Sequence, residues 1–219
     1  MKPDFDILSH NEDAIKAIMN NIKSTDRDHA DFYIYEDTPD QIAMSGGRAY
    51  LLTVEYGKRI PDNVIHRYQR TGGAVFNIHR ADPRKYAGAS VLNHQILNGE
   101  SIADVSLIRV RPNEPLDGGE LLNMWPVNIK NMLYPEAVEE CRLRYVHIVR
   151  YLLQYSKGNL QEAITSHKFT RRSPEDSELM LPEPEQRRIM AADNERFPAF
   201  FMLGGRKIIL KAYPEAPPE

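Results

Sequence analysis

A run of apolar residues at helical spacing between positions 135 and 156 constrains the fold more than any other feature of the chain. Its members recur three or four positions apart, which places them on one face of a helix. They are Val138, Cys141, Tyr145, Ile148, Val149 and Leu152. Pro135 suits the first helical turn, and Gly158 stands where a left-handed residue ends a helix. Asn159 and Glu162 have capping-box spacing and predict a second helix at once. The sequence therefore predicts a long central helix over 135–156, packed into the core.

Glycine pairs between apolar segments predict a sheet that contains hairpins. Gly46-Gly47 separates 41–45 from 48–56, and Gly204-Gly205 separates 197–203 from 206–213. Paired glycines supply the positive φ angles of a two-residue turn. Further strands are predicted over 31–37, 74–80 and 105–111. Helices are predicted over 12–23, 61–70, 82–98 and 185–196. The segment 112–131, which contains Trp125, is predicted to be irregular. These elements interleave without a regular β-α-β period, so we expect an α+β fold with an antiparallel sheet packed against helices.

The composition is that of a globular protein, with 219 residues of which 42% are apolar and 27% charged. We expect a main α+β domain over 1–172, a polar connector over 173–184, and a C-terminal helix and hairpin over 185–219 packed on the same domain. No apolar run is long enough for a membrane span, and the N-terminus lacks the pattern of a signal peptide. Cys141 is expected to be a buried, inert thiol in a reducing, cytoplasmic compartment.

Charge is distributed in alternating blocks along the chain. The segments 57–85 and 142–172 are basic, whereas 1–56 and 86–141 are acidic. Such blocks can neutralise one another within the fold, or they can form a positive face for a polyanion. Both interpretations stay open on the sequence alone.

No motif of a known catalytic or metal site is present. The seven histidines have no ligand spacing, and no Walker loop, dinucleotide fingerprint or nucleophile elbow occurs. The most suggestive cluster of basic side chains flanks the strand over 74–80. It consists of Arg67, Arg70, His79, Arg80, Arg84 and Lys85. Arginine and histidine near a helix N-terminus can hold a phosphate or a nucleic acid, although a solvated helix face with surface ion pairs has the same composition.

A second basic cluster lies beyond the central helix. The segments 152–164 and 166–173 resemble the helix-turn-helix of the Fis-type DNA-binding regulators. This resemblance implies that Gly158-Asn159 forms the bend before the motif. It also implies that Lys168, Arg171 and Arg172 lie near a DNA backbone. A helix that follows a Gly-Asn corner is also a common structural device, so both interpretations stay open.

Because no catalytic constellation is found, we expect a non-enzymatic interaction protein, such as an inhibitor, an adaptor or an assembly subunit. Its charge blocks would dock on a protein partner, and a homo-oligomer stays open. The alternative is a DNA- or RNA-binding regulator that uses 57–85 and 142–172. A third hypothesis is an enzyme or sensor for a phosphorylated small molecule, bound at Arg80 and Arg84. No cofactor, no metal and no membrane contact are expected.

Overall fold

The computed structural model describes residues 4–22, 31–35, 49–153, 161–162, 168–169, 184 and 199–210. The chain forms two compact units, Met1–Arg171 and Arg172–Glu219. None of the helices in these residues is long and apolar enough to cross a membrane.

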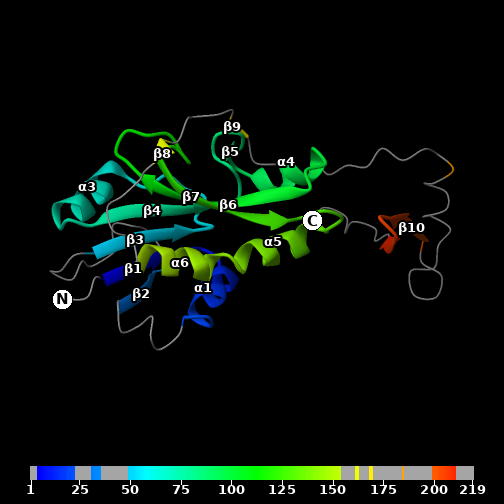
Figure 1. The fold of residues 1–219 in the computed structure, drawn as a ribbon, viewed down its shortest axis with the longest axis horizontal. Coiled ribbons are helices and arrows are strands. Elements are labelled where there is room, and N and C mark those ends of the chain that lie inside the picture. Colours follow the sequence, from blue (N-terminus) through cyan, green and yellow to red (C-terminus); the bar gives the residue numbers. More distant parts are fainter. Residues whose placement is uncertain are drawn as a thin grey trace, which may run out of the picture. The chain divides into compact units, whose positions relative to one another are not determined.

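The first unit is built on a seven-stranded sheet with the order β2-β1-β3-β4-β6-β7-β8 (Figure 1). The strands are β1 (Asp4–Leu8), β2 (Asp31–Tyr35), β3 (Ala49–Val54), β4 (Ala74–His79), β6 (Ile102–Val110), β7 (Glu120–Asn128) and β8 (Gln161–Glu162). Strands β2, β1, β3 and β4 pair in parallel, whereas β6, β7 and β8 join them in antiparallel pairs. The α+β class is confirmed, and the antiparallel sheet is corrected to a mixed sheet with a parallel half.

The parallel half arises because helices return the chain to the same end of the sheet. Helix α1 (Glu12–Met19) lies between β1 and β2 in sequence, and α3 (Asp62–Arg70) lies between β3 and β4. Parallel neighbours need such a crossover connection. Strand β3 pairs with β1 along one edge and with β4 along the other. The predicted pairing of this strand with 41–45, in a hairpin at Gly46-Gly47, is therefore wrong. Its turn and first arm lie outside the described residues.

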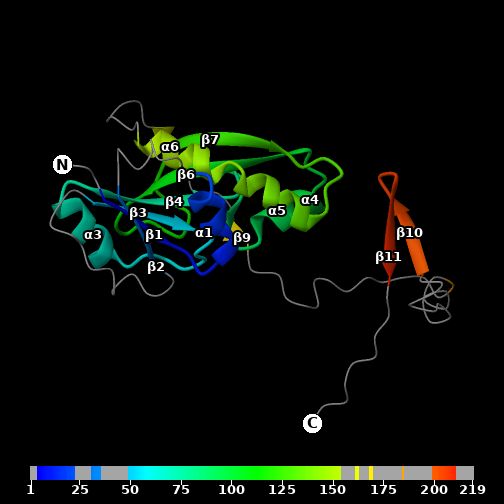
Figure 2. The same cartoon turned by 90° about the horizontal axis from the view of Figure 1, so that it is seen from below.

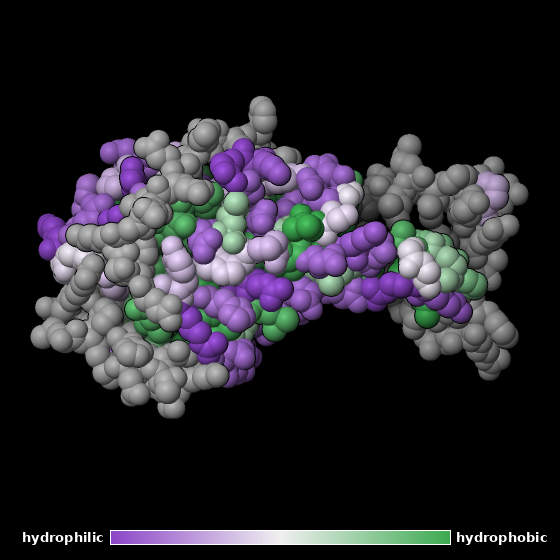
Figure 3. All heavy atoms as spheres, in the orientation of Figure 1, coloured by the Kyte–Doolittle hydropathy of each residue, from purple (hydrophilic) through white to green (hydrophobic). Residues whose placement is uncertain are grey.

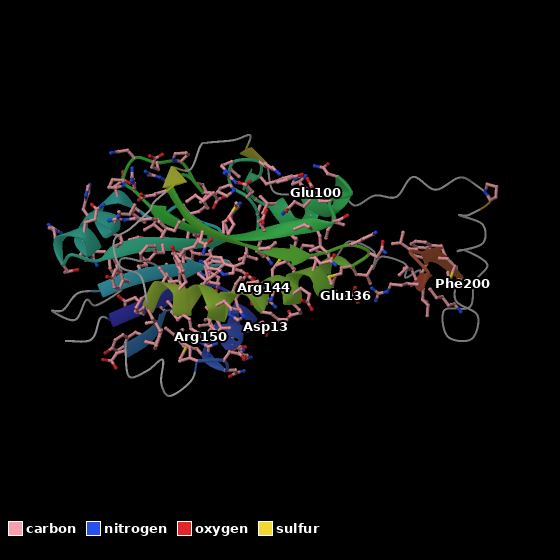
Figure 4. The ribbon with its side chains drawn as sticks, in the orientation of Figure 1. Asp13, Glu100, Glu136, Arg144, Arg150 and Phe200 are labelled. Carbon is pink, nitrogen blue, oxygen red and sulfur yellow. The ribbon has the colours of Figure 1, made fainter. Side chains whose placement is uncertain are left out.

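Helices cover both faces of the sheet. Helices α1, α5 (Tyr134–Arg142) and α6 (Tyr145–Leu153) contact one another and share one core with the sheet (Figure 1). Arg150 of α6 donates a 2.9 Å hydrogen bond to the carbonyl of Asn21, just after α1 (Figure 4). Helix α3 packs in a second core with Leu51 and Val75, which alternate along β3 and β4 with side chains of the first core. This second face also carries the candidate site.

The predicted central helix is two helices rather than one. The chain turns at Leu143 and Arg144, where the N–H of Arg144 bonds to the Cys141 carbonyl three residues back. The whole predicted stripe is nevertheless buried, and burial raises the pKa of the Cys141 thiol to about 12, as expected of an inert cysteine. The helix predicted to begin at Asn159 is also wrong, because 161–162 form β8 and pair with β7.

Two further predictions between 82 and 131 are corrected. Only Val91–Leu97 is helical in the segment 82–98 and forms α4, because Gly88 has a φ of 102° and Ser90 a φ of 56°, which no α-helix contains. Gly88 belongs instead to the short strand β5 (Ala87–Gly88), which pairs with β9 (Lys168–Phe169). Trp125, placed in an irregular loop, lies on β7.

The second unit contains one described hairpin, β10 (Ala199–Leu203) and β11 (Arg206–Leu210) (Figure 2). Its turn residues Gly204 and Gly205 have φ angles of 55° and 79°, so the predicted two-residue turn is confirmed. Apolar side chains such as Phe200 and Met202 are exposed on it. Figure 3 shows green, hydrophobic spheres at the surface of this unit. The connector over 173–184, apart from Pro184, and the helix over 185–196 lie outside the described residues.

Candidate active site

The site begins at the carboxyl end of β4, in the parallel half of the sheet. Asn77 and His79 are two residues apart on this strand and therefore point to the same face. Thr53, opposite Asn77 on β3, donates its hydroxyl to Asn77 Oδ1 at 2.8 Å. This bond fixes the side-chain amide, since the oxygen is taken and the NH₂ group must point elsewhere. The amide donates to Asp117 Oδ1 at 3.0 Å.

Asp117 comes from the loop between β6 and β7. Its Oδ1 atom lies 3.3 Å from His79 Nδ1, and its Oδ2 atom accepts the Gly88 N–H at 2.8 Å. The side chain is only 6% exposed. The loop needs its glycine at position 119, where φ is 121° and a Cβ atom would lie 2.4 Å from the Arg109 carbonyl oxygen. The loop is thereby pressed onto β6, which holds the carboxylate in place.

His79 lies between two acceptors. Its Nε2 atom is 2.7 Å from the Tyr86 carbonyl oxygen, and its Nδ1 atom faces Asp117. Burial lowers the pKa of His79, but Asp117 and the Tyr86 carbonyl outweigh it, so the pKa is raised. Burial likewise raises the pKa of Asp117, but His79 outweighs it, so this pKa is lowered. The two side chains therefore favour a buried pair of an imidazolium and a carboxylate.

Asn77, His79 and Asp117 line a pocket of about 300 Å³. Its volume is at the small end of the range for ligand sites. The wall combines polar and charged residues with apolar ones, among them Ile60, Ile65, Val110 and Leu116. A pocket that mixes apolar walls with a few convergent polar groups is the usual form of a small-molecule site.

A second charged cluster borders the pocket at the end of β3. Glu55, which has a φ of 50°, accepts two hydrogen bonds of 3.1 Å from Arg142. Tyr145 Oη and Asn11 Nδ2 each donate to it at 2.8 Å. Arg80 Nη1 lies 3.6 Å away. Burial raises the pKa of Glu55, but Arg142 and Arg80 outweigh it, so the pKa is lowered and the carboxylate stays charged.

The structure divides the basic cluster predicted around β4. His79 and Arg80 line the pocket, whereas Arg67, Arg70, Arg84 and Lys85 do not. Arg67 and Arg70 lie on α3. Arg84 is paired with Asp82 at 2.9 Å, so its charge is already matched. That the residues of this predicted cluster bind an anion stays a prediction.

The predicted DNA-contacting residues are only partly described. Lys168 begins β9, whereas Arg171 and Arg172 lie outside the described residues. Most of the Fis-like segment lies outside them as well. Its described parts, 161–162 and 168–169, are strands, so the helix-turn-helix interpretation is wrong there.

Sequence reasoning missed Asn77 and Asp117, and with them the centre of the site. One signal was available, because Asn77 and His79 are polar and share one face of an otherwise apolar strand. Nothing local connects Asp117 to them, since 40 positions separate it from Asn77. Among the described residues no group of three or more histidine, cysteine or carboxylate side chains could hold a metal ion.

Comparison with known proteins places the chain beside formyltransferases. No protein-family model matches it. Over 91 residues it is 28% identical to the methionyl-tRNA formyltransferase of Finegoldia magna, covering 42% of this chain and 28% of that protein. Over 127 residues it is 24% identical to the methionyl-tRNA formyltransferase of Mycoplasmopsis pulmonis, covering 57% of this chain and 42% of that protein. The matches thus span less than half the length of these relatives.

Two solved structures extend the likeness to nearly the whole chain. The methionyl-tRNA formyltransferase from Clostridium thermocellum matches with a TM-score of 0.66 and 18% identity, over 97% of this chain and 93% of that one. HypX from Aquifex aeolicus, solved in complex with tetrahydrofolic acid, matches with a TM-score of 0.65 and 17% identity, over 96% of this chain and 38% of that one. These similarities overturn the expected non-enzymatic interaction protein, and they give no support to nucleic-acid binding. The chain has a formyltransferase-like fold.

Proposed function

We propose that the chain is an enzyme that transfers a formyl group to an amine, with Asn77, His79 and Asp117 as its catalytic residues. The observation that carries the proposal is the buried cluster of an amide, an imidazole and a carboxylate on the wall of a pocket. The matched relatives are named formyltransferases, which supports the reaction class.

The geometry suits attack on a formyl carbon. As the amine attacks, the electrons of the carbonyl bond move onto oxygen, and this negative charge needs hydrogen-bond donors. Asn77 Nδ2 carries two hydrogens, of which Asp117 takes one, so the other is left for the oxygen. The positive charge of His79 stabilises the same oxygen.

The carboxylate of the charged pair accepts and later returns the proton that moves during the transfer. The attacking amine loses a proton as its bond to the formyl carbon forms, and the Asp117 carboxylate accepts it, because the imidazolium of His79 already carries a proton on both nitrogens. The proton then returns to the nitrogen that leaves when its bond to the formyl carbon breaks. Gly88 N–H and Asn77 hold the carboxylate in one orientation throughout.

A formylated tetrahydrofolate is the donor we propose. HypX was solved with tetrahydrofolic acid. WlaRD, a sugar 3N-formyl transferase that matches 78% of this chain with a TM-score of 0.52 and 18% identity, was solved in the presence of dTDP and 5-N-formyl-tetrahydrofolate. Such a donor supplies a formyl group on nitrogen. The apolar side chains of the pocket, Ile60, Ile65, Val110 and Leu116, suit a flat ring of the size of a pteridine.

The test is a transfer assay with a matched pair of histidine variants. The purified chain is incubated with 10-formyltetrahydrofolate and a panel of primary amines, and formylated amine is measured by mass spectrometry. We expect His79→Asn to lower the rate about 100- to 1,000-fold, as the loss of an oxyanion-stabilising group does. The control is His66→Asn, on the exposed face of α3, which should leave the rate unchanged. Equal rates in the two folded variants would contradict the assignment.

A further inference from the structure

Arg80 directly follows His79 and lines the same pocket. Its side chain is 22% exposed, so the guanidinium is largely withdrawn from bulk water. The backbone at this point is held by Gln95, whose amide donates to the Arg80 carbonyl at 2.9 Å. A fixed cation therefore lies beside the catalytic histidine.

The carboxylate next to this cation is already committed to other donors. Glu55 Oε1 accepts from Arg142 Nε at 3.1 Å and from Tyr145 at 2.8 Å. Its Oε2 atom accepts from Arg142 Nη2 at 3.1 Å and from Asn11 at 2.8 Å. Arg80 approaches only to 3.6 Å, which is beyond hydrogen-bond distance. Glu55 thus holds Arg80 in place by charge without satisfying its N–H groups.

Other arginines of the pocket wall are matched more closely. Arg59 bonds to Asp62 at 2.9 Å, and Arg111 contacts Glu120 at 3.0 Å. Within the part of the chain that the structure describes, Glu55 is the sole carboxylate that contacts Arg80. A guanidinium has five N–H donors in a planar fork that fits a carboxylate or a phosphate. An anion in the pocket would accept hydrogen bonds from the N–H groups of Arg80.

We propose that Arg80 binds an anionic group, a carboxylate or a phosphate, on the amine that accepts the formyl group. The inference rests on the proposed function, because it places this anion beside the reacting nitrogen. It narrows the acceptor class to small amines that carry such a group, such as amino acids or phosphorylated amines. Glu55 is then a positioning residue, which aims the guanidinium without neutralising it.

The test uses matched acceptors and three variants. Formyl transfer is measured for phenylalanine against its amide, and for phosphoethanolamine against ethanolamine, which separates a carboxylate from a phosphate. We expect the wild type to prefer one anionic acceptor. Arg80→Met should raise the KM for that acceptor about 10- to 100-fold, as expected for the loss of a charged hydrogen bond, and leave the neutral acceptor unaffected. Arg80→Lys should restore part of the preference. Arg70→Met, which removes an exposed arginine outside the pocket, is the control.

A binding measurement makes the inference independent of catalysis. The melting temperature of each variant is recorded with inorganic phosphate and with acetate, at constant ionic strength. Stabilisation of the wild type that Arg80→Met loses and Arg70→Met keeps supports the anion site even if no amine is formylated, in which case only the proposed reaction fails. Two outcomes overturn the inference: an anion preference that Arg80→Met leaves unchanged, or neither a preference nor stabilisation in the folded wild type.

Discussion

Replacing Glu55 by glutamine removes the buried charge that joins the ends of β1, β3 and β4 to the corner between α5 and α6. The side chains of Glu55 and Arg142 are 7% and 8% exposed, and Tyr145 also donates to the carboxylate. Breaking a buried ion pair from one side costs about 3–5 kcal/mol. Glu139 still contacts Arg142 in the variant, and glutamine keeps one acceptor oxygen. We therefore expect a loss of about 2–3 kcal/mol in the free energy of unfolding.

Arg142 offers a matched control, because Glu139, another carboxylate that it contacts, is exposed. Glu139 contacts Arg142 but is 67% exposed, so Glu139→Gln should cost less than about 1 kcal/mol. Urea unfolding measures both, with the fluorescence of Trp125 as the probe, since its ring lies 5.6 Å from that of Tyr151 on α6. Equal losses for the two variants would refute the view that burial sets the strength of this pair.

The pH dependence gives this prediction a second check. The pKa of Glu55 is lower in the folded chain than in the unfolded one. Its stabilising contribution is therefore present above the unfolded pKa, about 4.3, and is lost as the pH falls through the folded pKa. The difference in stability between the wild type and Glu55→Gln should shrink below about pH 4. A difference that stays constant down to acid unfolding would contradict the assignment of a charged carboxylate.

Two further predictions concern the catalytic cluster. The pKa of His79 is raised by folding, so the stability that its charge contributes is present below about pH 6.5 and is lost as the pH rises through the folded pKa. Urea unfolding at several pH values should show this loss in the wild type and not in Asp117→Asn, and identical profiles would count against the ion pair. Gly119→Ala should cost about 1–3 kcal/mol and lower formyl transfer, because its Cβ atom meets the Arg109 carbonyl at a φ of 121°. Gly99→Ala, at a φ of 72° in open space and outside the pocket, should cost about 1 kcal/mol and spare the rate, and thermal unfolding beside the transfer assay separates the two variants.

Local signals in the sequence predicted the local structure well. Asn11 caps α1 as expected, with its side chain accepting the N–H groups of Asp13 and Ala14. Gly99 ends α4 with a φ of 72°, and Gly204-Gly205 closes the hairpin. In each case the physical cause lies within a few residues of the signal, so one sequence contains all of it.

The pairing of strands and the assembly of the site depend on distant contacts, and there sequence reasoning failed. A local signal also failed at Asp82-Pro83, which has the pattern of a helix start, because Asp82 accepts three hydrogen bonds from the nearby Arg84 instead of capping a helix. The choice of β1 and β4 as neighbours of β3 is likewise set by crossover helices and not by the turn chemistry next to it. Asp117 reaches His79 only because β6 and β7 place their connecting loop over the end of β4.

The measurement that tests the central claim most directly follows a carbon-labelled formyl group from 10-formyltetrahydrofolate onto an amine, in the wild type and in Asp117→Asn. The variant keeps the size of the side chain while removing the charge that faces His79. We predict label on the amine with the wild type and a rate at least about 100-fold lower with the folded variant. Label transfer at the same rate in both would contradict the role of the Asn77–His79–Asp117 cluster, and no transfer by the folded wild type to any amine of the panel would contradict the proposed reaction.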